Sequence, residues 1–110
     1  MLSIIGLGTK KGELTQDAYV ALQSAHAVFV RTAQHPSAEN LREAGIAFES
    51  FDALYNSSRN YDTFVKKAVS LVRSRAKTQD VCYCVDGGTF EDRAACILAR
   101  GKGVRVYPGV

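Results

Sequence analysis

Short apolar runs alternate with longer, more polar segments along the chain, and this pattern predicts strands separated by helices. The runs have the length and the β-branched content typical of buried parallel strands. We expect five strands, at residues 2–6, 27–30, 46–49, 80–85 and 104–107. No Asn-Gly turn joins two of the runs, and the segments between them suit helices better than hairpin loops.

Apolar residues recur at helical spacing in the early connecting segments. A first helix is expected to begin after Thr15, a favourable N-cap residue. Its inward positions are Leu14, Ala18, Leu22 and Ala25. A short helix should open at Pro36 and stop at Gly45. Residues 50–60 are polar and rich in turn-forming residues, so we expect an irregular segment there.

The later segments predict one long and one shorter helix. The long helix is capped by Asn60 or Asp62. Its expected inward face consists of Phe64, Val65, Ala68, Val69 and Val72. The last helix is expected to start with Thr89 and Asp92 as a capping box and to end at Gly101. Its expected inward residues are Phe90, Ala94, Ile97 and Leu98.

Strands that alternate with helices define an α/β fold, in which a parallel sheet is covered by helices on both faces. The chain has 110 residues, of which 46% are hydrophobic and 23% charged, as expected of one domain with an ordinary core. In such folds ligands bind beyond the carboxyl ends of the strands. The loops that follow the strands are therefore the first place to look for a site.

The loop after the first strand carries Gly6, Gly8 and Gly12, which would let a backbone approach a ligand closely. It does not match the dinucleotide fingerprint, because Lys11 stands where the third glycine is required, and it contains no Walker sequence. A tight turn without a ligand is the alternative interpretation. Arg31 ends the second strand, where it would suit a 2′-phosphate, so NADP-type binding remains a weaker alternative.

The loop after the fourth strand, Asp86-Gly87-Gly88-Thr89, is a candidate ligand-binding loop for the same reason. Its two glycines permit close approach of a ligand, and Asp86 could accept hydrogen bonds from an amine or a hydroxyl. A glycine turn with a helix cap is the alternative here. No nucleophile–base pair or catalytic carboxylate pair is visible in the sequence.

Cysteine, histidine and charge patterns narrow the functional classes. Cys82 and Cys84 share one face of a strand and, with Cys96, are expected to be buried thiols rather than metal ligands or disulfides. His26 is expected to cap the first helix, and His35 to be exposed in a loop. The net charge is +3. The basic residues Arg59, Lys66, Lys67, Arg73, Arg75 and Lys77 are spread along one helix. They suit a solvated face better than a nucleic-acid site.

No apolar run reaches the ~20 residues that span a bilayer, and the N-terminal residues do not form a signal peptide. We therefore expect a cytoplasmic protein without a membrane segment. The sequence stops at Tyr107-Pro108-Gly109-Val110, directly after the fifth strand, and looks like a domain cut at its boundary.

Taken in order, these segments resemble the tetrapyrrole (corrin/porphyrin) methylase family. Residues 6–15, Gly-Leu-Gly-Thr-Lys-Lys-Gly-Glu-Leu-Thr, are similar to its G-x-G-P-G-D-x-x-x-L-T motif, although the proline and the acid are missing. Residues 25–28 match its A-x-x-V, and residues 85–89 resemble V-P-G-[DH]-P without either proline. Residues 108–110 match its P-G-V. Residues 31–36 and 45–52 are similar to the subgroup fused to a MazG-type nucleoside triphosphate pyrophosphohydrolase.

The resemblance implies a five-stranded parallel sheet of order 3-2-4-1-5, forming the N-terminal lobe of a two-lobed methyltransferase. The cofactor it implies is S-adenosylmethionine, held in a cleft with a C-terminal lobe that is absent from this chain. The implied cofactor-binding residues are Gly6, Gly8, Thr9, Asp86, Gly87, Gly88, Thr89 and Pro108. It also implies a small-molecule methyl acceptor such as a tetrapyrrole, a homodimer, and a downstream pyrophosphohydrolase domain. The altered loops keep a second hypothesis open, a non-catalytic domain that senses a ligand or organises a dimer for such a pyrophosphohydrolase.

Overall fold

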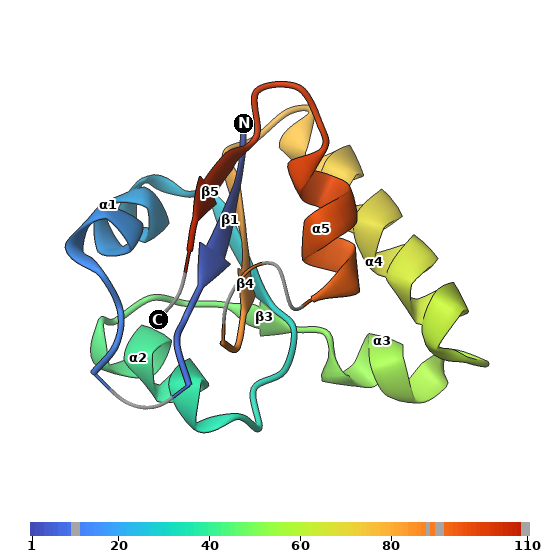
Figure 1. Ribbon diagram of the computed structural model, residues 1–110, viewed down its shortest axis with the longest axis horizontal. Helices are drawn as coiled ribbons and strands as arrows, with labels where there is room; N and C mark the ends of the chain where they lie inside the picture. Colours follow the sequence, from blue (N-terminus) through green and yellow to red (C-terminus); the bar gives the residue numbers. More distant parts are fainter. Residues whose placement is uncertain (10–11, 88, 90–91, 109–110) are drawn as a thin grey trace.

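Five parallel strands form the central sheet, in the order β3-β2-β4-β1-β5 (Figure 1). The computed structural model describes residues 1–9, 12–87, 89 and 92–108. The strands are β1 (Leu2–Gly6), β2 (Ala27–Val30), β3 (Glu49–Ser50), β4 (Val81–Val85) and β5 (Arg105–Tyr107). The α/β class and the strand order expected from the resemblance are both confirmed.

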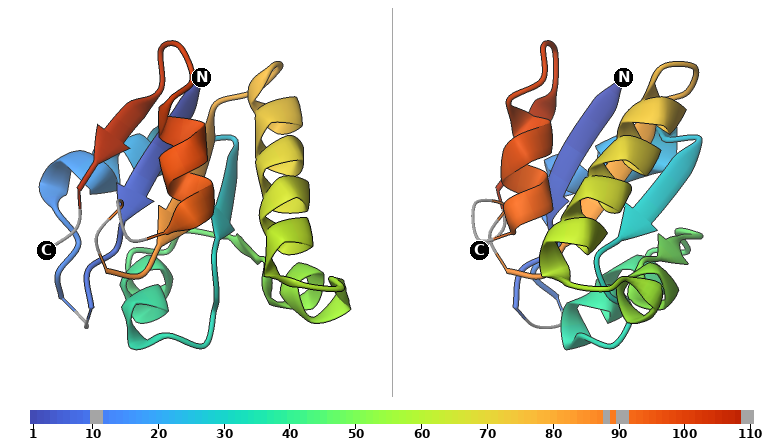
Figure 2. Two further views of the ribbon diagram at one scale, coloured as in Figure 1. Left: turned by 45° about the vertical axis from the view of Figure 1, so that its right-hand side comes forward. Right: turned by 90° about the vertical axis from the view of Figure 1, so that its right-hand side faces the viewer.

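Helices cover both faces of the sheet and make the fold three-layered. They are α1 (Gln16–Ser24), α2 (Glu39–Glu43), α3 (Asp52–Ser57), α4 (Tyr61–Ala76) and α5 (Arg93–Ala99), with a 3-10 turn, η1 (Pro36–Ala38), before α2. Figure 2 shows α4 and α5 over one face, with α1 behind the other. None of the helices in the described ranges is long and apolar enough to cross a membrane.

The inner strands β1 and β4 are buried along their whole length because both of their faces are mainly apolar. On one face Ile4 and Tyr83 pack against α4 and α5. On the other face Ile5 and Cys84 pack against α1 and α2. The five inward residues expected of the long helix are all buried, and Asn60 is its N-cap. Because these strands pair in parallel, the carboxyl ends of β1, β2 and β4 lie together at one end of the sheet.

Cys82 and Cys84 lie on the α1 side of β4, where both thiols are buried. Burial, with a smaller contribution from the charge of Asp80, raises the pKa of Cys82 to about 12. Burial also raises the pKa of Cys84 well above its usual value. Both thiols therefore stay protonated, as expected of residues that only fill the core.

The third strand and the segment after it differ from the prediction. The strand lies at Glu49–Ser50 rather than at 46–49, and it pairs only with the last two residues of β2. Ile46 and Phe48 are partly buried against the α1-side core without joining the ladder, which explains their strand-like alternation. The expected irregular segment contains α3, which begins after the buried residue Phe51.

Two predicted helix caps are wrong. Helix α5 begins at Arg93, because the side chain of Asp92 accepts a hydrogen bond from the N–H of Ala95 at 2.8 Å. Thr89 lies outside this helix, and Phe90 lies outside the described residues. His26 does not cap α1; its Nδ1 accepts the N–H of Asp80 at 3.4 Å and ties the start of β2 to the start of β4.

Candidate functional site

The loops that follow β1 and β4 lie side by side at the carboxyl end of the sheet. The N–H of Gly87 donates to the carbonyl oxygen of Gly8 at 2.7 Å, and the N–H of Leu7 donates to that of Val85 at 2.8 Å. Gly8 has φ +82° and Gly87 has φ +73°, a backbone region that disfavours any side chain. The fold thus brings together two of the predicted site residues, Gly8 and Gly87, which contact each other through backbone atoms.

Glu13 holds the first loop closed over Gly8. Its Oε1 accepts the N–H of Thr9 at 2.8 Å and the hydroxyl of Thr9 at 3.1 Å. A Cβ atom placed on Gly8 would stand 2.6 Å from the Cβ of Glu13. Glycine at this position therefore lets the loop fold back on itself.

Asn40, on α2, holds the same loop in place through two side-chain hydrogen bonds. The side chain is 5% exposed. Its Oδ1 accepts the N–H of Gly12 at 2.7 Å, and its Nδ2 donates to the carbonyl oxygen of Leu7 at 3.1 Å. Sequence reasoning missed this residue, because a single polar residue in a helical segment gives no sign that it will point inward.

Replacing Asn40 with leucine should lower the free energy of unfolding by about 1–3 kcal/mol, since the backbone groups of Leu7 and Gly12 lose a buried partner. Urea denaturation monitored by circular dichroism measures this change. Asn56→Leu is a matched control, because Asn56 is exposed on α3. An equal effect in both variants would contradict the assigned role.

The other predicted site residues are distributed around this contact. Gly6 is buried at the end of β1, beside Val85. Pro108 is exposed and follows Tyr107, which pairs with Ile5, so it lies at the same end of the sheet. Thr89 is 2% exposed, and its hydroxyl has no hydrogen-bond partner among the described residues. Gly88 lies outside them.

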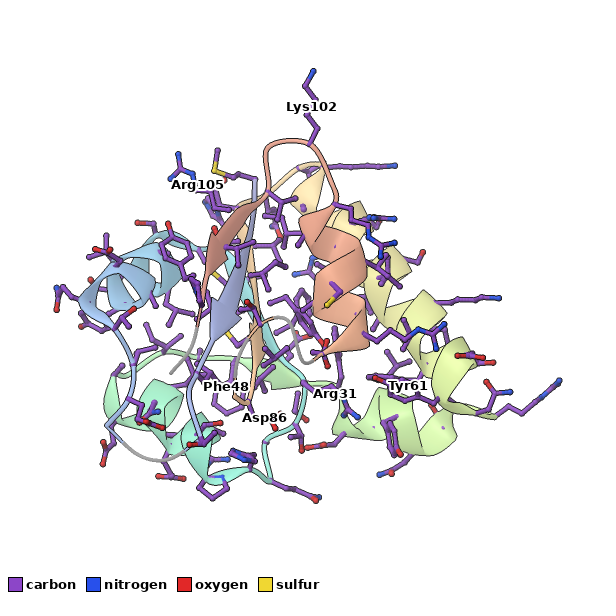
Figure 3. All side chains as sticks on the ribbon, viewed as in Figure 1. Arg31, Phe48, Tyr61, Asp86, Lys102 and Arg105 are labelled. Atoms are coloured by element: carbon purple, nitrogen blue, oxygen red, sulfur yellow. The ribbon has the colours of Figure 1, made fainter. Side chains whose placement is uncertain are left out.

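A polar cavity of about 520 Å³ opens beyond the ends of β2 and β4. It is lined by Arg31, Thr32, Gln34, Asp52, Tyr55, Asn56, Tyr61, Asp86 and Asp92. Of the residues predicted for the site, Asp86 lies in this lining. Figure 3 places Arg31, Tyr61 and Asp86 along the lower end of the molecule, opposite Lys102. We call this space the β2–β4 cavity.

Arg31 forms part of the wall of the β2–β4 cavity. Its N–H donates to the carbonyl oxygen of Cys84 at 2.9 Å, which continues the ladder between β2 and β4. Its guanidinium carbon lies 4.8 Å from the ring centre of Tyr55 and 4.7 Å from that of Phe64. Its Nε is 3.8 Å from Oδ1 of Asp92. The guanidinium is therefore enclosed by two rings and faces a carboxylate.

Asp92 lines the β2–β4 cavity and also contacts a buried side chain of the core. Besides capping α5, its Oδ2 accepts the hydroxyl of Tyr83 at 3.2 Å. Burial raises the pKa of Tyr83 well above its usual value, and the charge of Asp92 adds to this effect. Tyr83 therefore remains a hydrogen-bond donor, and Asp92 supplies its acceptor.

Asp52 is the second carboxylate of the cavity. Its Oδ2 accepts the N–H of Ala33 at 3.0 Å. Burial alone would raise its pKa, but hydrogen bonds from Thr32, Ala33 and Ser50 and the charge of Arg31 outweigh burial and lower it. Asp52 is thus held in its ionised form.

Asp86 faces His35, which the sequence placed in an exposed loop. His35 is only partly exposed, and its Nε2 lies 3.8 Å from Oδ2 of Asp86. Its Nδ1 accepts the N–H of Ser37 at 3.1 Å, so a neutral ring carries its proton on Nε2, toward the carboxylate. The two residues are far apart in sequence, and no local pattern links them. Among the described residues, no group of three or more His, Cys, Asp or Glu side chains could hold a metal ion.

The same fold occurs in solved structures of enzymes. A diphthine synthase matches with a TM-score of 0.71 and 18% identity, over 99% of this chain and 44% of that one. A cobalamin-biosynthesis precorrin-6Y methylase from Archaeoglobus fulgidus matches with a TM-score of 0.63 and 18% identity, over 100% of this chain and 53% of that one. A putative diphthine synthase from Entamoeba histolytica gives a TM-score of 0.64 and 24% identity, over 98% of this chain and 40% of that one. At these identities the matches show the fold alone.

One curated relative is similar in sequence. The uncharacterized protein YabN of Bacillus subtilis (strain 168) is 27% identical over 90 residues, which are 81% of this chain and 18% of YabN. No protein-family model matches the chain. The chain therefore spans about a fifth of this relative and about half of the first two solved enzymes.

Proposed function

We propose that this chain is the N-terminal, cofactor-binding lobe of an S-adenosylmethionine-dependent methyltransferase of the tetrapyrrole methylase type. The observation that carries the proposal is the contact between Gly8 and Gly87 at the carboxyl end of a sheet of order 3-2-4-1-5. The shared fold with a precorrin methylase and two diphthine synthases supports it. So does the sequence resemblance of the two loops to that family.

The residues around the two loops fit such a cofactor. Gly8 and Gly87 have no side chains where the two loops meet, although both residues are buried and Glu13 packs against Gly8. Thr89 offers a buried hydroxyl with no partner among the residues described here. The residues proposed to hold the cofactor are Gly6, Gly8, Thr9, Asp86, Gly87, Gly88, Thr89 and Pro108. The sulfonium of S-adenosylmethionine supplies an electrophilic methyl group, so this lobe mainly has to orient donor and acceptor.

The same proposal includes a second lobe, the location of the protein, its oligomeric state and a further domain. A second lobe would complete the cleft, and the protein would act in the cytoplasm as a homodimer on a small-molecule acceptor. A downstream pyrophosphohydrolase domain is proposed from the subgroup resemblance. The share of YabN that this chain spans leaves room for such a domain.

Calorimetric titration with S-adenosylhomocysteine tests the proposal. The titration uses the protein extended beyond residue 110, with the 110-residue chain in parallel. We expect binding to the extended protein and its loss in Gly87→Val, because a branched side chain disfavours φ +73° and would cover the contact with Gly8. Gly103→Val is the matched control, since Gly103 has φ +77° but lies in the turn before β5, away from the site.

Two results would contradict the proposal. If the extended protein binds no S-adenosylhomocysteine, the non-catalytic ligand-sensing or dimer-organising hypothesis takes its place. If Gly87→Val and Gly103→Val weaken binding equally, the contact between the glycine loops does not form the cofactor site.

A further inference from the structure

We propose that the β2–β4 cavity binds a small organic cation of the ammonium class and, on the basis of the proposed function, that this cation is the methyl acceptor. The charge of the lining is the first argument. Asp52, Asp86 and Asp92 contribute three carboxylates, and among the described lining residues Arg31 alone is basic. The lining therefore carries a formal excess of negative charge, which attracts cations.

The charge of Arg31 is already engaged within the protein. Its Nε faces Asp92 at 3.8 Å, and the rings of Tyr55 and Phe64 lie within 5 Å of its guanidinium carbon. An anionic ligand would have to compete with the carboxylate of Asp92 for this group. The charge of Arg31 also lowers the pKa of Asp52 and offsets part of its negative charge, so Asp86 is the carboxylate most available to a ligand.

Two tyrosines give the cavity an aromatic rim. Tyr55 is 46% exposed and Tyr61 is 42% exposed, which is high for large aromatic residues. Both rings are fixed against the buried Phe64, with centroid distances of 5.3 Å and 6.2 Å. The guanidinium of Arg31 already lies over one face of Tyr55, 4.8 Å from the ring centre, so Tyr61 provides the aromatic surface beside the carboxylates that attracts an ammonium group.

The carboxylates are held in place by different contacts. Asp52 is fixed by the N–H of Ala33. Asp86 is 39% exposed and faces His35, so it is the carboxylate most open to a ligand.

An amine held here has a balanced route to methylation. The ammonium group loses one proton to Asp86, which leaves a neutral nitrogen with a free electron pair. With S-adenosylmethionine held by the neighbouring loops, that nitrogen would form a bond to the methyl carbon of the sulfonium, while the bond from this carbon to sulfur would break and leave its electrons on sulfur. The products are an N-methylated ammonium ion and neutral S-adenosylhomocysteine.

The test uses choline as the probe and its uncharged isostere 3,3-dimethylbutan-1-ol as the ligand control. Both are titrated into the ¹⁵N-labelled 110-residue protein, and amide chemical shifts are followed. We expect choline to shift the signals of residues 31–34 and 52–56 and to bind at least about threefold more tightly than the alcohol. Equal affinities, or choline shifts confined to other regions, would overturn the proposal.

Matched variants locate the cation. Tyr61→Leu should weaken choline binding about threefold, because one aromatic face is lost. Tyr19→Leu is the control, since Tyr19 lies on α1 and is not part of the cavity lining. Asp86→Asn should also weaken binding while leaving the size of the side chain unchanged. Equal effects of Tyr61→Leu and Tyr19→Leu would overturn the assignment of the cavity.

Two further titrations separate the sources of the cation and the two proposals. Shifts at residues 31–34 with S-adenosylmethionine but not with S-adenosylhomocysteine would identify the cofactor's own sulfonium as the cation and overturn the acceptor role. In the extended protein, S-adenosylhomocysteine binding without choline binding would overturn this inference alone. Choline binding without S-adenosylhomocysteine binding would support a cation site and overturn the methyltransferase proposal.

Discussion

Replacing Asp92 with alanine is expected to lower the free energy of unfolding by about 2–4 kcal/mol. Two main losses add up in this variant, which also removes the carboxylate that faces Arg31. Helix α5 loses the side chain that caps the N–H of Ala95, which typically costs about 1 kcal/mol. The hydroxyl of Tyr83, on a residue that is 0% exposed, loses its acceptor and is left unpaired in the core. Urea denaturation of the wild type and the variant measures the sum.

A double-mutant cycle separates the two losses. Tyr83→Phe removes the hydroxyl and should cost about 1 kcal/mol by itself. In the Asp92→Ala background the same change should cost nothing or be stabilising, because it removes an unpaired buried group. Asp92→Asn is the conservative control, since an amide oxygen can still cap the helix. Strictly additive effects of Asp92→Ala and Tyr83→Phe would show that this hydrogen bond does not couple the two residues.

The second large effect is expected from Gly8→Ala, which should lower the free energy of unfolding by about 2–4 kcal/mol. Alanine at φ +82° is strained by about 1–2 kcal/mol. Its Cβ would also stand 2.6 Å from the Cβ of Glu13, an atom too close to its own backbone to rotate away. The loop would have to move, and with it the hydrogen bond from the N–H of Gly87. Thermal or urea unfolding gives the stability change, and S-adenosylhomocysteine titration of the extended protein gives the effect on the proposed site.

Gly45→Ala isolates the backbone strain from the steric clash. Gly45 has φ +72° and no atom within 4 Å of an added Cβ, so only the strain of about 1–2 kcal/mol is expected there. The clash should also be relieved when Gly8→Ala is combined with Glu13→Gly, which removes the opposing Cβ. If Gly8→Ala costs no more than Gly45→Ala, the close approach of Glu13 has no energetic effect.

Local sequence patterns predicted most of the fold because each of its main elements has its own signal. Four strands lie within a residue or so of their expected positions. Three of them, β1, β2 and β4, are almost wholly buried and must therefore be apolar throughout, whereas β5 is only partly buried. The third strand was predicted a few residues too early, because Ile46 and Phe48 are partly buried without being paired in the sheet. The long helix was predicted down to its buried face because its length and amphipathic spacing leave no ambiguity.

The candidate site was only partly accessible from the sequence. Glycines after strands point to close backbone approach, and the contact between Gly8 and Gly87 agrees with that reasoning. Asn40, the pairing of His35 with Asp86 and the enclosure of Arg31 depend on contacts between segments far apart in the chain. No local periodicity encodes such contacts. The sequence therefore does not predict the cavity, which forms where β2, β4 and α3 come together in the fold.

The position of β1 inside the sheet, between β4 and β5, has a consequence for how the chain acquires its structure. Its neighbours are β4 and β5, so Leu2 pairs with Val81, and Ile5 with Tyr107. During synthesis at about 5–20 residues per second, the first strand must wait several seconds for its first partner. Pairing over such long sequence separations is slow and leaves apolar segments open to association with other chains. The ribosome-bound chain would therefore pass through a stage in which its earliest strand is a target for chaperones that bind extended apolar segments.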